Sequence, residues 1–492
     1  PPSRAFGKLH LEIQKGPRMH YPFKTKPYDH QMTALEKGWK KKEYGYFMEM
    51  GTGKSKVIVD TASMLYDSGK IGGLLIVAPK GVYRNWSSKE LPDHMPAHID
   101  MRVAVWSSNL TKSKKEEINH LFQPNDELNI LVINIDALIT KKGSIVIDKF
   151  LNSRHCMMVV DESTIIKTPG AQRTKAAIKF SKMARYRRIL TGSPVTKSPL
   201  DVYSQCEFLN PNLLGHSSYY GFRNRYAVTQ PLDVGGRTIK QVVGYKNTDE
   251  LKDILQEFTY RVTKDECLDL PEKIFMKREF EMKKGQKKAY EDMRRMAIAF
   301  IEGQEATTTV VITQLLRLHQ ISCGFLPMDD GTLTVFENNR LTELKTLLDE
   351  TEGKAIIWAN YRHDIFLIKE YLEKEYGKNS YVTYFGDTAD DARVEGVRQF
   401  QDPQDPVRFF LGNTQTGGYG ITLTEASTVI YYSNNYDLEK RLQSEDRAHR
   451  IGQHHPVTYV DLVCKDTVDA KIIQALRSKI SLAQAVTGDK WK

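Results

Sequence analysis

The sequence predicts an α/β protein of two lobes, each a parallel sheet flanked by helices. The chain has 492 residues, enough for two or more domains that each bury a core. In both halves, short apolar runs alternate with helical stretches, which is typical of parallel strands covered by helices on both faces. A stretch at 206–272, rich in Pro, Gly, aromatic and charged residues, interrupts this alternation. We therefore expect the two lobes to join across an irregular middle.

The expected strands are short apolar runs, as strands buried on both faces are. In the first half they lie at 46–50, 74–78, 130–133, 157–160 and 188–190. Residues 283–320 read as helices, and strands then resume at 355–358, 381–385, 409–411, 428–432 and 458–462. The predicted division is a basic N-terminal extension (1–26), lobe one (27–266, with an irregular segment at 206–266) and lobe two (267–492, with a helical insertion at about 283–325 and a closing helix at about 467–484).

The chain is basic, with a net charge of +10, and residues 1–26 hold six Lys/Arg against one Glu. This balance suits a polyanion bound through its phosphates, although a merely soluble basic protein fits the charge equally well. The five cysteines include no Cys-x-x-Cys pair, so we expect reduced thiols in an intracellular protein and neither disulfides nor zinc. No apolar run approaches the roughly 18 residues that span a bilayer, and a secretory signal is not expected.

The segment 50–55 has the layout of a phosphate-binding loop, because it lies between an apolar stretch and an apolar run at 57–59. Such a glycine-rich turn leads into a helix N-terminus and points backbone N–H groups at a phosphate. The complete pattern asks for glycine where this chain has Met48, so the short match alone also fits a chance turn. The predicted phosphate-binding residues are Met50, Gly51, Thr52, Gly53, Lys54 and Ser55, with Lys54 placed at the β- and γ-phosphates and Ser55 as a Mg²⁺ ligand.

A second element lies about a hundred residues further on. The apolar run at 156–160 ends in Asp161 and Glu162, at the expected carboxyl end of a buried strand. There, Asp161 can hold the water shell of Mg²⁺, and Glu162 can orient and polarise an attacking water. Together with the loop at 50–55, this element predicts that the chain hydrolyses a nucleoside triphosphate.

The second lobe contains the most specific segment of the chain, at 443–453. Arg447 and Arg450 are three residues apart, so on a helix they share one face and suit the charge on a γ-phosphoryl group during transfer. Upstream, 414–424 combines three glycines, including Gly420, with several threonines after an expected strand. Alone, that segment fits an ordinary tight turn as well as a phosphate-binding one.

The stretch Gly-Gly-Tyr-Gly-Ile-Thr-Leu-Thr at 417–424, followed by Gln443 and Arg-Ala-His-Arg-Ile-Gly-Gln at 447–453, resembles the Swi/Snf ATPase family of superfamily-two helicases. The likeness runs in order from about residue 27 to about 480, through segments at 27–31, 50–55, 77–80, 161–164, 190–194, 270–273, 354–361 and 467–469. It implies two RecA-like lobes with ATP and Mg²⁺ bound between them. It also implies that Gln31 reads the adenine and that Gln443, Gly420 and both arginines belong to the ATP site.

The resemblance further implies DNA as the partner, duplex or branched, with RNA as an alternative and protein partners unknown. Thr164 stands where the family usually has histidine, so we expect a reorganised link between Glu162 and the nucleic-acid side; Thr422 stands where asparagine is frequent. No bromodomain-, chromodomain- or SANT-like segment is evident, which favours a minimal viral, bacterial or fork-remodelling member, working in the cytoplasm or nucleoid, over a nucleosome remodeler. The implied nucleic-acid contacts are Lys80, Arg84, Thr191, Lys197, Tyr361, Arg362 and Thr414.

Three functions remain open from the sequence. A double-stranded-DNA translocase with DNA-stimulated ATP hydrolysis is favoured, and a strand-separating DNA or RNA helicase is the alternative from the same superfamily. A non-catalytic nucleic-acid-binding scaffold is disfavoured, because Lys54, Asp161, Glu162, Arg447 and Arg450 are all present. Nearly 400 residues separate Lys54 from Arg450, so a complete site requires the lobes to close on ATP.

Overall fold

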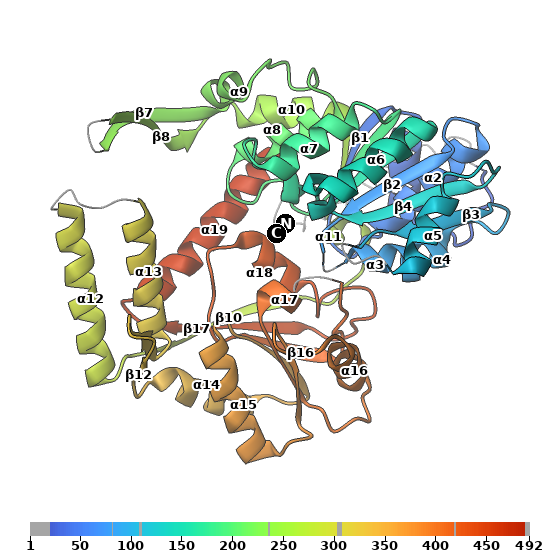
Figure 1. Ribbon diagram of the computed structural model, residues 1–492. Coiled ribbons are helices and arrows are strands. Elements are labelled where there is room, and N and C mark those ends of the chain that lie inside the picture. Colours follow the sequence, from blue (N-terminus) through green and yellow to red (C-terminus); the bar gives the residue numbers. More distant parts are fainter. Residues whose placement is uncertain are drawn as a thin grey trace, which may run out of the picture.

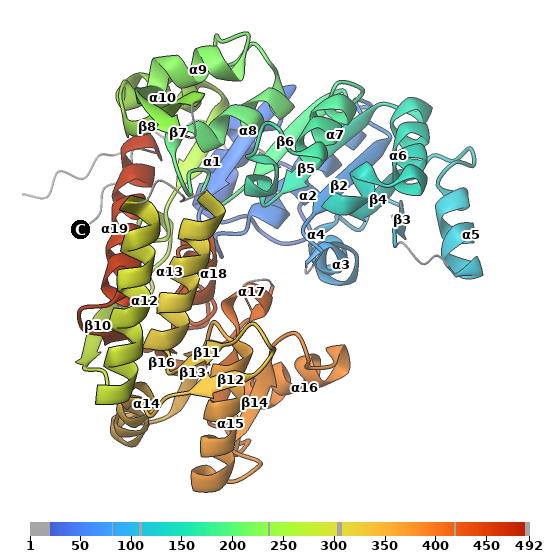
Figure 2. The ribbon, with the colours of Figure 1, turned by 60° about the vertical axis from the view of Figure 1, so that its left-hand side comes forward.

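The structure, a computed structural model, describes residues 20–80, 82–107, 111–234, 237–302, 308–417 and 420–487. Figure 1 shows two lobes, one above the other, and Figure 2 shows them after a 60° turn. Most of the predicted N-terminal extension and two residues of the glycine-rich turn, Gly418 and Tyr419, lie outside the described residues.

Lobe one is built on a seven-stranded parallel sheet in the order β3-β4-β2-β5-β6-β1-β9. The five predicted strands are confirmed, with ends shifted by one to three residues. Two were missed because they lie at the edges of the sheet, where partial exposure breaks the apolar pattern. The strands are β1 (Glu43–Met48), β2 (Gly73–Ala78), β3 (Met101–Val105), β4 (Leu128–Asn134), β5 (Cys156–Asp161), β6 (Tyr186–Leu190) and β9 (Thr259–Val262).

Helices cover both faces of this sheet. Successive side chains of a strand point to opposite faces, so Leu74 and Ile76 of β2 join one core cluster while Leu75 and Val77 join the other. This double burial explains why the strands read as unbroken apolar runs. The helices of this part are α1 (Asp29–Gly38), α2 (Lys54–Asp67), α3 (Tyr83–Asn85), α4 (Leu91–His94), α5 (Lys112–His120), α6 (Lys141–Ser153), α7 (Gln172–Ser181) and α8 (Val202–Leu209).

The segment 206–266, predicted to be irregular, is regular structure, and that expectation is corrected. It contains α9 (Tyr219–Tyr226), α10 (Thr248–Phe258), α11 (Lys264–Cys267) and an antiparallel hairpin of β7 (Ala227–Val234) and β8 (Arg237–Tyr245). Apolar residues such as Phe222, Leu251 and Leu255 fix α9 and α10 to the core of lobe one. The hairpin extends away from the lobe and is largely exposed, so its sequence lacks the apolar run of a buried strand (Figure 1).

Lobe two has a six-stranded parallel sheet in the order β10-β17-β16-β13-β15-β14. Its five predicted strands are confirmed, whereas the exposed edge strand β10 was missed. The strands are β10 (Lys273–Phe280), β13 (Lys354–Trp358), β14 (Tyr381–Tyr384), β15 (Phe409–Gly412), β16 (Ala426–Tyr431) and β17 (Val457–Cys464), beside a small hairpin of β11 (Phe325–Pro327) and β12 (Leu333–Val335). The helices are α12 (Lys284–Glu302), α13 (Thr308–Ser322), α14 (Asn339–Glu350), α15 (Arg362–Tyr376), α16 (Asp390–Gln401), α17 (Thr414–Gly417) and α18 (Leu438–Glu445).

The last helix, α19 (Val468–Thr487), connects the lobes a second time. It leaves β17 of lobe two and runs up to α10 of lobe one, as both ribbon views show. Its residue Val486 belongs to the lobe-one core, whereas Ile472 and Leu476 pack against α18. Two segments therefore connect the lobes: the chain between β9 and β10, and the packed helix α19. Among the described helices, none is both long and apolar enough to cross a bilayer.

Candidate nucleotide site between the lobes

A cavity of about 260 Å³ lies where the two lobes meet. Lobe one contributes the loop at 50–55 and the end of β5, and lobe two contributes the turn after α18. The predicted residues that line it are Met50, Gly51, Gly53, Lys54, Ser55, Asp161, Glu162, Gly420, Arg447 and Arg450, together with Thr422. The fold thus brings most of the predicted ATP-site residues, separated by up to nearly 400 positions, into one hollow.

The loop at 50–55 has the backbone geometry that its glycines allow. Gly51 and Gly53 take φ values of 79° and 84°, which side chains with a Cβ rarely adopt. A Cβ on Gly53 would also come within 2.1 Å of the Gln31 amide nitrogen. Lys54 begins α2, and its Nζ donates to the carbonyl oxygens of Met48 at 3.0 Å and Glu49 at 3.4 Å. These bonds hold the ammonium at the cavity wall.

Gln31 and Thr52 support the loop from behind. The Gln31 side chain is buried and donates to the Thr52 carbonyl at 3.1 Å, while its own oxygen accepts the Tyr28 N–H at 3.0 Å. The Thr52 hydroxyl donates to the Glu49 carbonyl at 2.7 Å. Neither side chain lines the 260 Å³ cavity. The adenine contact implied for Gln31 therefore stays a prediction.

Asp161 and Glu162 lie at the carboxyl end of β5. Asp161 accepts the Trp86 indole N–H at 2.9 Å and the Glu162 backbone N–H at 3.0 Å. Glu162 has a φ of 48°, a strained value that turns its side chain out of the strand direction. Burial raises the pKa of Glu162 to about 7; the neighbouring Asp161 adds to this, whereas Lys54 opposes it. A carboxylate with a pKa near neutrality suits a base that takes a proton from water.

The donors for Mg²⁺ fit a site that the nucleotide completes. Ser55 and Asp161 present a hydroxyl and a carboxylate to the same cavity, and both are the hard oxygen ligands that Mg²⁺ prefers. No cluster of three or more His, Cys, Asp or Glu suited to a metal occurs among the described residues. Mg²⁺ commonly binds through one or two carboxylates together with phosphates and water.

Six lining residues were missed by sequence reasoning: Val82, Asn85, Trp86, Lys89, Glu90 and Asp446. Four of them lie on α3 and the helical turn after it, in a segment without a recognisable motif. Trp86 holds the Asp161 carboxylate, and a Cβ on Gly420 of lobe two would lie only 2.7 Å from the Asn85 amide. Gly420 also has a φ of 72°, which favours glycine, and it packs against Asn85 and Val82 of lobe one.

The two arginines converge, but they lie in the turn after α18 and not on a helix as their spacing was taken to predict. Arg447 Nη1 and Arg450 Nη1 donate to the same carbonyl, that of Ile421, at 3.1 and 3.2 Å. Arg447 also donates through Nε to the Gln443 carbonyl at 2.9 Å. Burial and the neighbouring Arg450 lower the pKa of Arg447 to about 10. The Gln443 side chain is fully buried, does not line the cavity, and supports Arg447 through its backbone.

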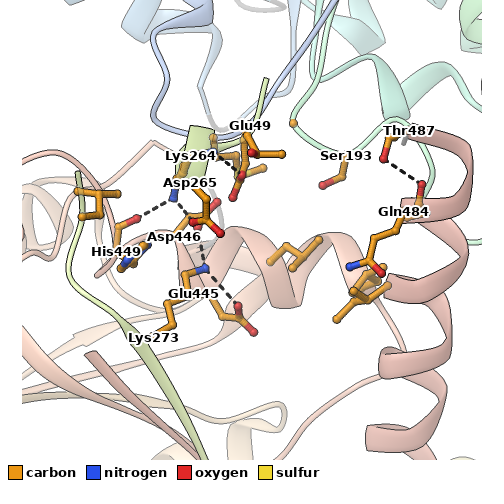
Figure 3. Close-up of a pocket in the computed structure, with 18 of the residues that line it drawn as sticks. Glu49, Ser193, Lys264, Asp265, Lys273, Glu445, Asp446, His449, Gln484 and Thr487 are labelled. Atoms are coloured by element: carbon orange, nitrogen blue, oxygen red, sulfur yellow. Dashed lines mark hydrogen bonds and ion pairs between the residues drawn. The ribbon is translucent and has the colours of Figure 1, made fainter. Parts of the chain in front are cut away.

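A second cavity, of about 490 Å³, adjoins the first, and Met50 and Asp446 line both. Figure 3 shows its centre, where Lys264 Nζ donates to the Asp446 carboxylate at 2.6 Å and the His449 carbonyl at 2.7 Å. The backbone N–H of Lys264 donates to the Glu49 carboxylate at 2.8 Å, and Lys273 approaches Asp446 at 3.3 Å. The buried Lys264 thus connects the residue before the phosphate loop to the arginine-bearing turn.

The predicted nucleic-acid contacts are placed in two different ways. Lys80, Arg84, Lys197 and Arg362 are exposed, although Arg362 pairs with Asp387. The other three are turned inward. Thr191 and Thr414 are buried, and the Tyr361 hydroxyl bonds to His319 at 2.7 Å. For those three, a contact to a phosphate would have to come from the backbone or from a rearranged side chain.

The fold and the cavity define a two-lobed protein of the phosphate-loop class, with RecA-like lobes that each supply half of one nucleotide site. Residues 41–324 match the SNF2-related domain and residues 339–452 match the helicase conserved C-terminal domain. The chain therefore belongs to the SNF2 family of helicase-like ATPases within superfamily two.

Relatives in the family share about a quarter of the sequence. Chromodomain-helicase-DNA-binding protein 1-like of Danio rerio is 25% identical, over 89% of this chain and 41% of the relative. The human DNA annealing helicase and endonuclease ZRANB3 is 25% identical (90% and 40%), and the SWI/SNF chromatin-remodeling complex subunit snf22 of Schizosaccharomyces pombe is 24% identical (96% and 28%). The chain thus spans less than half the length of these relatives. The SWI2/SNF2 ATPase core of Sulfolobus solfataricus, solved with dsDNA, is 23% identical, with 96% of each chain covered and a TM-score of 0.43.

Proposed function

We propose that this chain is an ATP-driven motor that moves along double-stranded DNA without obligatory strand separation. A single cavity carries this proposal, because it gathers Lys54, Ser55, Asp161 and Glu162 from lobe one against Arg447 and Arg450 from lobe two. Membership of the SNF2 family and the DNA-related names of several relatives support DNA as the track.

The side chains assign the steps of ATP hydrolysis. Glu162 accepts a proton from the water that attacks the γ-phosphorus, and the bond from phosphorus to the bridging oxygen breaks, leaving phosphate and ADP. Lys54 leaves the Met48 and Glu49 carbonyls for the phosphates, and the arginine pair faces the charge that spreads over the γ-phosphoryl oxygens. Mg²⁺, bound through Ser55 and Asp161, would neutralise charge on the β- and γ-phosphate oxygens.

Movement follows from the split of the site between the lobes. ATP draws Arg447 and Arg450 towards the phosphate loop, and hydrolysis releases that contact, so the lobes alternate between two separations. Each lobe carries exposed basic residues from the predicted contacts, such as Lys197 in lobe one and Arg362 in lobe two. Alternating grip on a phosphate backbone gives stepping that does not read the base sequence.

One feature favours the second candidate, a strand-separating helicase. The exposed hairpin of β7 and β8 extends from lobe one, and a projecting hairpin is an element that can divide two strands. The two functions make different demands on the same experiment. A translocase displaces the third strand of a triplex and leaves a tailed duplex paired, whereas a helicase unwinds the tailed duplex.

The test measures ATP hydrolysis with duplex DNA, single-stranded DNA, RNA or no nucleic acid, and repeats the strand-displacement assays with Glu162→Gln as the inactive control. We expect the highest rate with duplex DNA of any sequence, an apparent affinity that falls steeply with salt, and triplex displacement that needs ATP. Stimulation by RNA alone, or efficient unwinding of the tailed duplex, would reject the translocase in favour of the helicase.

A further inference from the structure

A largely buried group of side chains joins lobe one to α18 of lobe two beside the nucleotide cavity. Thr164 Oγ1 donates to Glu439 Oε1 at 2.8 Å, and Gln443 Nε2 donates to the same oxygen at 3.3 Å. Lys167 Nζ lies 3.5 Å from Glu439 Oε2 and donates to Thr196 at 2.6 Å. Thr164 and Gln443 are buried, whereas the side chains of Lys167 and Glu439 are 18% and 12% exposed. We call Thr164, Lys167, Glu439 and Gln443 the interlobe link.

The interlobe link ends at catalytic candidates on both sides. Glu162 directly follows β5, and Thr164 lies two residues further on, in the short helical turn Ser163–Ile166. On the other side, Glu439 and Gln443 are one helical turn apart and share a face of α18. The Gln443 carbonyl accepts the Arg447 guanidinium at 2.9 Å. Hydrogen bonds together with short stretches of backbone therefore connect the base in lobe one with the arginine in lobe two.

The chain differs from its family at the lobe-one end of this path. Histidine is usual where Thr164 stands, and the shorter hydroxyl was expected to leave that connection reorganised. In the structure, a carboxylate from lobe two accepts a hydrogen bond from this hydroxyl. Hydrogen bonds to an ionised acceptor are about twice as strong as neutral ones, so this is a contact of the stronger kind.

We propose that Glu439 is a positioning residue for ATP hydrolysis, which fixes Glu162 relative to Arg447 by accepting hydrogen bonds from Thr164 and Gln443. It does not touch the reacting atoms and acts through its neighbours. The role rests on the proposed ATPase function. Substituting either end of the Thr164–Glu439 bond should therefore slow the chemical step without weakening ATP binding.

A double-mutant cycle tests this coupling. Thr164→Val removes the hydroxyl at nearly constant shape, and Glu439→Met removes the carboxylate. We expect each variant to lower the single-turnover hydrolysis rate about tenfold at saturating ATP and duplex DNA, with ATP affinity changed less than about twofold. The double variant should lose no more than Glu439→Met alone, because that single change already removes the bond to Thr164. Losses that multiply in the double variant would overturn the proposal.

Rescue by conservative variants separates positioning from a merely structural contribution. Thr164→Ser keeps a hydroxyl that can donate to Glu439, so it should restore most of the rate lost in Thr164→Val. Glu439→Gln can still accept from Thr164, so it should keep more of the rate than Glu439→Met. No rescue by serine would contradict the role of Glu439.

The matched control is Ser322→Ala. Ser322 Oγ donates to the Asp469 carboxylate at 2.9 Å, which is also a buried hydroxyl-to-carboxylate bond but lies within lobe two. The Ser322→Ala variant should lose thermal stability as Thr164→Val does, and its hydrolysis rate should stay near that of the unmodified protein. If the unmodified protein hydrolyses no ATP, the proposed function fails. If it does, and Thr164→Val and Glu439→Met remain near its rate, only the role of Glu439 fails.

Discussion

Replacing Lys264 by methionine should uncouple the phosphate loop from the arginine-bearing turn. The Lys264 side chain is 2% exposed and that of its partner Asp446 is 7% exposed, so the pair is shielded from solvent. The change removes the 2.6 Å contact to Asp446 and the 2.7 Å bond to the His449 carbonyl. The apolar stem is nearly conserved, so the loss is chiefly electrostatic.

The loss of folding free energy depends on the partners that Asp446 keeps in the variant. Leaving one member of a buried ion pair without its partner typically costs about 3–5 kcal/mol. Lys273 stays 3.3 Å from Asp446, so we expect the lower end, about 3 kcal/mol of folding free energy. If about half of this free energy stabilises the closed arrangement of the lobes, the variant destabilises that arrangement by about 1.4 kcal/mol. Hydrolysis then falls about tenfold, because about 1.4 kcal/mol corresponds to a factor of ten.

The assay compares single-turnover hydrolysis, ATP affinity and thermal unfolding for Lys264→Met and for Lys56→Met. Lys56 is a matched control, because it is equally buried and pairs with Asp60 at 2.8 Å entirely within lobe one. Both variants should lose stability, and only Lys264→Met should lose hydrolysis while keeping its ATP affinity. Equal losses of hydrolysis in the two variants would refute the coupling role of Lys264.

Further predictions concern the chemistry itself. Glu162→Gln should still bind ATP and Mg²⁺ but hydrolyse ATP about 10²–10⁴-fold more slowly. A nucleotide-binding assay measures the first property, and the rate of phosphate release measures the second. In the unmodified protein, hydrolysis should fall as the pH drops through about 7, because Glu162 protonates there and a protonated carboxyl cannot accept a proton from water. A pH-independent rate between 6 and 8 would exclude Glu162 as the base. Arg450→Ala should reduce hydrolysis by about 10³-fold or more with little effect on ATP affinity, and an equal loss of both would make Arg450 a ground-state binding residue.

The sequence by itself determined the strands that are buried on both faces and the residues that follow them. Runs such as β2 and β5 are apolar throughout because helices cover both faces of the sheet. The local sequence is therefore enough to predict each of these strands. The same locality fixes the phosphate loop, since its glycines, Lys54 and Ser55 are contiguous. Apolar and polar residues are mixed in the edge strands β3, β9 and β10 and in the exposed hairpin of β7 and β8. The sequence analysis therefore missed these strands or took them as irregular.

The tertiary structure alone decided which side chains from distant parts of the chain meet. Trp86 reaches Asp161 over 75 positions, Thr164 reaches Glu439 over 275, and Lys264 reaches Asp446 over 182. Trp86, Lys264 and Glu439 each lie in a segment whose local sequence fits an ordinary surface or core position. Hydrogen bonds and buried ion pairs depend on distances of a few ångström between separate elements, and such distances are set by how two sheets and α19 pack, a property that no local pattern contains.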